Sequence, residues 1–97
     1  LIYLINYKII KKKNFKYLKK IIFGGEGFPK IKLKELISLA GKNKKYFNVY
    51  GPTECTCICS SYKITKYDFK KSEINKYAPF GKKLARNFYM LILNEKK

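Results

Sequence analysis

The sequence contains no histidine and only one arginine, Arg86, among its 97 residues. The missing imidazole removes the partner that a nucleophilic cysteine needs, and it weakens any zinc-type site. The single guanidinium argues against base readout in nucleic acid, because arginine is the favoured group for base edges. Three cysteines, an odd number, form no disulfide framework, so we expect a reducing, cytoplasmic environment.

Long apolar runs are also absent. No stretch reaches the roughly 18 apolar residues of a membrane-spanning helix, so we expect no membrane span. The opening segment "LIYLINYKII" is short and is followed by lysines, the reverse of the signal-peptide order. The chain starts at Leu1 and stops at Lys97 just after a strand-like segment. We therefore expect residues 1–97 to be a partial domain with no complete second domain.

Acidic residues are scarce, with 6 against 23 basic residues, and the formal net charge is +17. Lysines that neutralise phosphates provide non-specific affinity, so a small basic nucleic-acid-binding module is an alternative function. The lysines are nevertheless spread along the whole chain, apart from Lys11–Lys13. Together with abundant Ile, Asn, Tyr and Phe, this spread resembles the codon bias of an AT-rich genome. The even spread of the lysines therefore favours a partner other than nucleic acid.

The hydrophobic pattern predicts two helical regions. Residues 1–20 place apolar side chains at near-helical spacing, interrupted near Asn14. Pro29 suits the first turn of a second helix, and Gly41 suits its end. Between them, one helix face is lined by four apolar residues: Leu33, Leu36, Ile37 and Ala40.

Four short strands are predicted, at residues 19–23, 45–49, 55–64 and 88–93. The order strand, helix, strand predicts an α/β fold in which the first two strands are parallel. We expect a short mixed sheet with one or two helices. On the third strand, the cysteines at positions 55, 57 and 59 alternate and would share one face. Packing as small apolar residues explains them better than metal binding.

Two glycine-containing loops each follow a predicted strand: "FGGEG" (23–27) and "VYGPTE" (49–54). Ligands of open α/β sheets bind outside the carboxyl ends of the strands. If the two strands are neighbours, both loops meet at one rim of the sheet. An ordinary Gly-Pro turn followed by a helix cap is the alternative interpretation.

The residue types in these loops suit a nucleoside triphosphate. Gly24 and Gly25 allow a flat ligand to approach the backbone, and Tyr50 offers a ring for stacking. Thr53 offers a hydroxyl to a phosphate oxygen, and Glu54 offers a carboxylate to the Mg²⁺ that accompanies phosphates.

The segment "NVYGPTECT" (48–56) resembles the Asn-x-Tyr-Gly-Pro-Thr-Glu signature of the adenylate-forming ligases, the AMP-binding superfamily. This superfamily includes amino-acid adenylation domains of non-ribosomal peptide synthetases, D-alanine–carrier-protein ligases and acyl-CoA synthetases. Upstream, "IIFGGEGFP" is similar to the family's Gly-Gly-Glu segment. Downstream, "APFGKKLARNFYMLILNEK" resembles its Pro-Ile-Gly-x-Pro segment, although Lys83 replaces the second proline and Arg86 a usual asparagine. The resemblance covers about residues 18–97 and implies a fragment of the large N-terminal domain.

The resemblance implies roles for individual residues. Asn48 would bond the adenine amino edge, Tyr50 would stack on the base, Thr53 would hold the α-phosphate and Glu54 would ligate Mg²⁺. The implied nucleotide-binding residues are Gly24, Gly25, Glu26, Asn48, Tyr50, Gly51 and Thr53. The implied acyl-substrate pocket contains Ile22, Gly24, Val49, Cys57 and Ile58. No catalytic residue is assigned within the chain.

The implied reaction uses ATP and Mg²⁺. A substrate carboxylate, by resemblance an amino acid rather than a fatty or aryl acid, attacks the α-phosphorus and releases pyrophosphate. The acyl group then passes to a thiol, either the phosphopantetheine of a carrier protein or coenzyme A. The family's phosphate loop, ribose-binding Asp and catalytic Lys are not found in the sequence. We therefore expect a bacterial, cytoplasmic fragment that is inactive alone.

Overall fold

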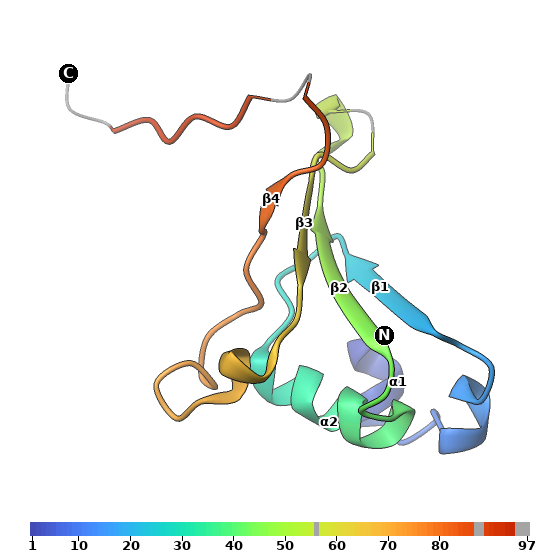
Figure 1. The fold of residues 1–97 in the computed structure, drawn as a ribbon. Helices are drawn as coiled ribbons and strands as arrows, with labels where there is room; N and C mark the ends of the chain where they lie inside the picture. Colours follow the sequence, from blue (N-terminus) through green and yellow to red (C-terminus); the bar gives the residue numbers. More distant parts are fainter. Residues whose placement is uncertain (56, 87–88, 95–97) are drawn as a thin grey trace.

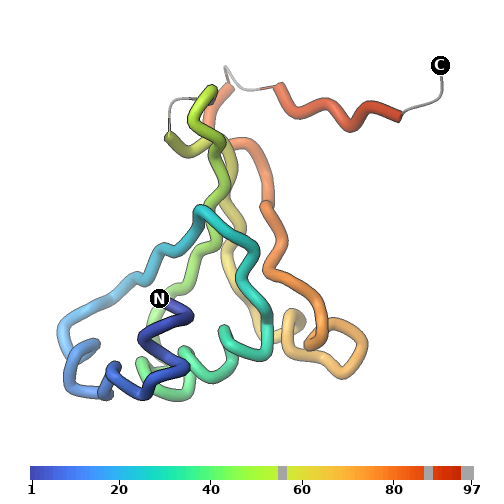
Figure 2. Tube along the Cα trace, turned by 180° about the vertical axis from the view of Figure 1, so that it is seen from behind, coloured from blue at the N-terminus to red at the C-terminus, as the bar shows by residue number. Residues whose placement is uncertain are grey.

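The computed structural model describes residues 1–55, 57–86 and 89–94, and it forms one mixed sheet with helices against one face (Figures 1 and 2). The sheet has four strands in the order β1-β2-β3-β4. In chain order the elements are α1 (Ile2–Asn6), the 3₁₀ turn η1 (Lys12–Phe15), β1 (Lys20–Gly24), α2 (Lys30–Ala40), β2 (Lys45–Tyr50), η2 (Thr53–Cys55), β3 (Ser60–Lys63), η3 (Lys66–Phe69) and β4 (Lys82–Lys83). The predicted α/β class with a short mixed sheet is confirmed.

The edge strand β1 and its neighbour β2 are parallel, as predicted, and α2 is the crossover between them. Their register pairs Gly24 with Val49, so the carboxyl ends of β1 and β2 stop at the same level. β3 runs antiparallel to β2 and pairs Ser61 with Val49. Both predicted glycine loops therefore lie at one end of the sheet, away from α2 (Figure 1).

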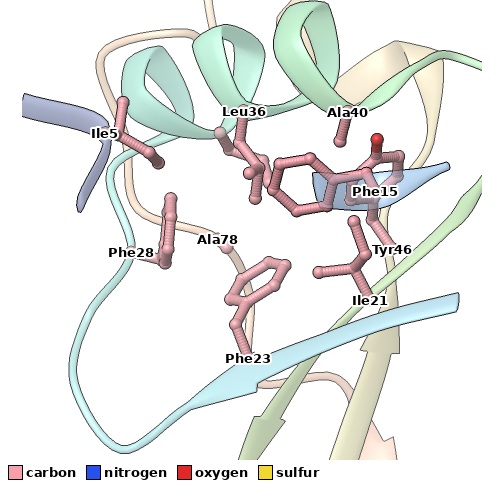
Figure 3. Close-up of a cluster of buried hydrophobic side chains, with 10 residues drawn as sticks. Ile5, Phe15, Ile21, Phe23, Phe28, Leu36, Ala40, Tyr46 and Ala78 are labelled. Atoms are coloured by element: carbon pink, nitrogen blue, oxygen red, sulfur yellow. The ribbon is translucent and has the colours of Figure 1, made fainter. Parts of the chain in front are cut away.

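Helix α2 covers the sheet because its apolar positions recur every three or four residues. Leu33 and Leu36 are fully buried and Ala40 is 4% exposed. They pack with Ile21 and Phe23 of β1 and with Tyr46 of β2 (Figure 3). Each buried leucine contributes about 1.5–3 kcal/mol through removal of apolar surface from water. Pro29 lies one position before the helix, as its N-cap, and Gly41 follows the helix with a φ of 115°.

The opposite face of the sheet carries no helix among the described residues. Side chains alternate along a strand, so residues between the buried ones point to this open face. Its members are Lys20 and Ile22 of β1, Lys45, Phe47 and Val49 of β2, and Ser61 and Lys63 of β3.

Three predicted elements were wrong in extent. The predicted helix over 1–20 is only the five-residue α1 and the 3₁₀ turn η1, since its interleaved lysines leave a narrow apolar stripe. The third strand begins at Ser60 rather than at residue 55, because η2 and the positive φ of Cys57 (87°) interrupt the extended chain. Residues 89–93 form no strand, while Phe88 lies outside the described residues.

Helices of the described residues are too short and too polar to cross a membrane.

Candidate functional site

The two glycine loops lie side by side at the carboxyl ends of β1 and β2. Gly24 faces the backbone oxygen of Val49 so closely that a Cβ atom at Gly24 would overlap it. Gly51 is packed in the same way against the backbone carbonyl of Cys57. Gly25 has a φ of 97°, a conformation that glycine adopts without strain. Glycine is thus required at the points where the two loops approach each other and turn.

A pocket of about 500 Å³ opens between these loops. All five residues that were predicted for the acyl pocket line it: Ile22, Gly24, Val49, Cys57 and Ile58. Gly24 was predicted for the nucleotide as well, and three further nucleotide residues line the pocket, namely Gly25, Gly51 and Thr53. Phe23 and Pro52, which were not predicted, complete the lining. The structure therefore brings eight of the predicted site residues to one cavity. Their roles toward a ligand stay a prediction.

Tyr50 and Val49 project to opposite faces of the sheet because they are consecutive in β2. Val49 lines the pocket, whereas Tyr50 shares its face with Asn48. The Tyr50 ring is 37% exposed and packs against Phe80, with ring centroids 4.5 Å apart and an interplanar angle of 36°. The ring that was predicted to stack on a base is therefore partly open and held from one side.

Asn48 is 3% exposed, and its amide nitrogen is already engaged. It donates hydrogen bonds to the carbonyl oxygens of Pro79, at 2.8 Å, and Ala78, at 3.2 Å. The amide nitrogen thus fastens residues 78–79 to β2. A bond to the amino edge of adenine, which donates, would use the amide oxygen of Asn48, and that contact stays a prediction. Such a buried amide is satisfied by the protein itself.

The two predicted carboxylates lie outside the pocket lining. Glu26 follows the first glycine loop, and Glu54 lies on the turn η2; both side chains are exposed. Among the described residues no three His, Cys, Asp or Glu side chains gather closely enough to form a metal cluster. Mg²⁺ commonly takes one or two carboxylates and completes its shell with phosphate oxygens and water. Glu54, which follows Thr53 on η2, offers one carboxylate to that kind of partial donor set.

The cysteines do not share one sheet face as predicted. Cys57 is an exposed, pocket-lining residue in a left-handed conformation, and Cys59 is 7% exposed beside β2. The Cys59 backbone nitrogen donates to the Tyr50 carbonyl at 2.9 Å. Cys55 lies on η2 rather than on a strand. The alternating pattern did not predict these positions because the chain turns at η2 and again at Cys57 before β3 begins.

Phe80 was missed by the sequence analysis. Its signal was present, because Ala78-Pro79-Phe80-Gly81 begins the downstream segment of the family resemblance. No local pattern shows its contact with Tyr50, because the two residues are 30 positions apart in the chain.

No protein-family model matches the chain. Over 78 residues, 80% of the chain, the sequence is 36% identical to bacitracin synthase 1 of Bacillus licheniformis. Over 82 residues, 81% of the chain, it is 35% identical to surfactin synthase subunit 1 of Bacillus subtilis. It is also 32% identical to aldehyde reductase lnaA of Aspergillus flavus over 71 residues, 73% of the chain. The chain spans only 1%, 2% and 7% of the lengths of these three relatives.

The fold is similar to that of the Vibrio cholerae adenylation domain AlmE, solved in complex with glycyl-adenosine-5′-phosphate. The TM-score is 0.60, and the match covers 86% of this chain and 15% of that one at 17% identity. The signature segment, the matches to peptide synthases and the shared fold agree with one another. The chain belongs to the adenylate-forming, AMP-binding superfamily, in which it corresponds to part of an adenylation domain.

Proposed function

We propose that the chain provides the acyl pocket and the base-stacking side of a site that activates an amino acid as its adenylate. The observation that carries the proposal is the single pocket between the two glycine loops, with Val49, Cys57 and Ile58 on one side and Ile22 on the other. The amino acid is supported by the similarity to peptide synthases and to a domain solved with a glycyl-adenylate. In this proposal ATP is the co-substrate, and a carrier or coenzyme A thiol is the acceptor.

The ligand would cross the end of β2. Its acyl group would occupy the pocket on the open face, next to Val49, while its base would reach Tyr50 on the other face. The phosphate would then pass over Gly51, where the Thr53 hydroxyl can donate a hydrogen bond to it. Such a path positions the carboxylate and the α-phosphate together, which is the main contribution a protein makes to this chemistry.

Mg²⁺ would be held by the Glu54 carboxylate. When bound, it neutralises negative charge on the phosphate oxygens during the attack. Within this chain, Thr53 orients the phosphate and the pocket receives the acyl group. The assignments of Gly24, Gly25, Glu26 and Gly51 to the nucleotide are part of the same proposal.

A partial adenylation domain that works in the cytoplasm is consistent with the free thiols of Cys57 and Cys59. The relatives come from both bacteria and a fungus, so the expected bacterial source stays a prediction.

Binding to a stable analogue tests the proposal. Glycyl-sulfamoyl-adenosine, whose sulfamate replaces the phosphate, is titrated into the 97-residue chain by isothermal calorimetry. We expect saturable binding, and we expect Val49→Trp to weaken it about tenfold or more, because the indole fills the pocket. The matched control is Ile31→Trp on α2; Ile31 is 53% exposed and does not line the pocket, so binding should be unchanged.

Two results would contradict this function. One is the absence of saturable binding by a chain whose circular dichroism shows it to be folded. The other is salt-sensitive micromolar binding to arbitrary DNA or RNA with no response to the analogue, which would favour the basic nucleic-acid-binding alternative. If a fatty-acyl sulfamoyl-adenosine binds more tightly than the aminoacyl compound, the proposed substrate changes from an amino acid to a fatty acid.

A further inference from the structure

The contact between Tyr50 and Phe80 joins two segments that are 30 positions apart. Their ring centroids are 4.5 Å apart, and the planes are tilted by 36°. Tilted or offset aromatic pairs are the favoured arrangements, and they add to the gain from buried area. Both rings remain partly open, at 37% exposed for Tyr50 and 53% for Phe80. The pair is therefore a surface platform and does not belong to the core.

Several polar contacts fix the segment that carries Phe80. Asn48 donates to the carbonyl oxygens of residues 78 and 79, as described above, and the Ser60 hydroxyl donates to the Phe80 carbonyl at 2.9 Å. Ser60 is fully buried, which shields this hydrogen bond from water. The backbone before and within Phe80 is therefore bonded to both β2 and β3.

Gly81 completes this attachment. Its φ is 82°, and a Cβ atom there would overlap the backbone carbonyl of Ser61. Only glycine can make this close approach without strain. Immediately after it, β4 pairs with β3, and the Leu84 backbone nitrogen donates to the Cys59 carbonyl at 2.9 Å. The chain is thus held on both sides of Phe80, and the Phe80 ring has a defined place beside Tyr50.

We propose that Phe80 is a positioning residue that orients the Tyr50 ring for stacking on a purine base, held in place by Asn48, Ser60 and Gly81. The inference rests on the proposed function and adds a residue to it. Phe80 does not need to touch the ligand. It restricts the motion of the exposed Tyr50 ring, so that less side-chain freedom is lost when a base stacks on the part of the ring left open. The base side of the site would then be ordered before the ligand arrives.

The test compares two ligands that differ only in the base. The first is glycyl-sulfamoyl-adenosine, and the second carries the same glycyl-sulfamoyl-ribose without adenine. The dissociation constant of the base-free ligand is divided by that of glycyl-sulfamoyl-adenosine. This ratio measures the contribution of the base in each variant of the 97-residue chain. We expect Phe80→Ala to reduce this ratio about three- to tenfold, the scale of one aromatic contact, and to leave binding of the base-free ligand unchanged.

The controls separate orientation from general stability. Phe80→Tyr keeps a ring in place and should retain the wild-type ratio. Tyr67→Ala removes an aromatic ring that is 59% exposed and remote from the site, and it should also retain the ratio. If Phe80→Ala does not fold, Phe80→Leu keeps apolar bulk without a ring and takes its place in the comparison.

The outcomes are distinct. A wild-type chain that binds neither ligand overturns the proposed function. A wild-type chain that binds both equally overturns the nucleotide side of that function and this inference with it. A wild-type ratio above one that Phe80→Ala and Phe80→Leu leave intact overturns only the positioning role.

Discussion

Lys30 places its ammonium nitrogen 3.4 Å from the carboxylate of Asp68, and the two side chains are only 3% and 5% exposed. A second carboxylate, that of Glu73, lies 3.1 Å from the same nitrogen. Asp68 also accepts hydrogen bonds from the Tyr62 hydroxyl and from the backbone and side chain of Thr65. The buried charge is therefore paired and bonded on all sides, and it connects the start of α2 to η3.

Removing one member of this pair should be strongly destabilising. Lys30→Met leaves the Asp68 carboxylate buried without its cation, and we expect the free energy of unfolding to fall by about 3–5 kcal/mol. Urea denaturation followed by circular dichroism measures the change. Lys32→Met is the matched control, because it breaks a partly exposed pair with Glu35 and should change stability by less than about 1 kcal/mol. Equal losses in both variants would show that burial of the Lys30 pair has no special effect.

Stability should also fall in alkaline solution. Burial alone would lower the Lys30 pKa, but the carboxylates of Glu73 and Asp68 outweigh it and raise that pKa above 10.5. Burial raises the pKa of Tyr46 above 10.0, and burial with the Asp68 charge does the same for Tyr62. The folded chain therefore holds these protons more tightly than the unfolded chain. The stabilisation is complete below the ordinary values and is lost as pH rises through the raised ones.

Melting temperatures measured from pH 8 upward test this dependence. We expect a plateau followed by a decline that begins near 10.0, the ordinary value for tyrosine. Tyr62→Phe removes one of the titrating groups and should make the decline shallower. If the melting temperature of the wild-type chain stays level through the alkaline range, the pKa values of Lys30, Tyr46 and Tyr62 are not raised by folding.

A methyl group at Gly24 should damage both the sheet and the pocket. Its Cβ would overlap the Val49 carbonyl, which is backbone and cannot move aside cheaply. We expect Gly24→Ala to lower stability by about 1–3 kcal/mol. The comparison is Gly25→Asn, since a side chain at Gly25 meets nothing within 4 Å and asparagine tolerates a positive φ. Denaturant titration of the two variants should separate them, and similar losses would argue against the close approach.

Asn48→Asp tests the attachment of residues 78–79 to β2. The substitution keeps the shape of the side chain but replaces the donor by a carboxylate that faces two carbonyl oxygens. Loss of a buried hydrogen bond and burial of an unpaired charge should lower stability by about 2–3 kcal/mol at neutral pH. The loss should shrink in acid, where the protonated carboxyl regains a donor. If the stability lost in Asn48→Asp does not depend on pH, the hydrogen bonds to the two carbonyl oxygens are not what makes an amide necessary at position 48.

The sequence predicted the parallel pair of β1 and β2, helix α2 and the pocket because each has a short-range signal. The helix spacing from Leu33 to Ala40 and the glycines after β1 and β2 are local patterns, and parallel neighbours bring their carboxyl ends together without further information. The true start of the third strand and the Tyr50–Phe80 contact had no such signal. The positive φ of Cys57 accompanies the close packing of its own carbonyl against Gly51, and an alternating pattern does not reveal that contact. The family resemblance supplied the pocket-lining residues that periodicity could not.

The uncovered sheet face has a consequence for how copies of this chain meet one another. Its apolar strip is bordered on all three longer strands by ammonium groups, so stacking two such faces in dilute salt brings like charges together. Salt shortens the reach of that repulsion from about 10 Å at 0.1 M to about 3 Å at 1 M, while the attraction between apolar surfaces persists. Higher ionic strength should therefore weaken the repulsion between two such faces. The side chains concerned are Lys20, Lys45 and Lys63 around Ile22, Phe47 and Val49.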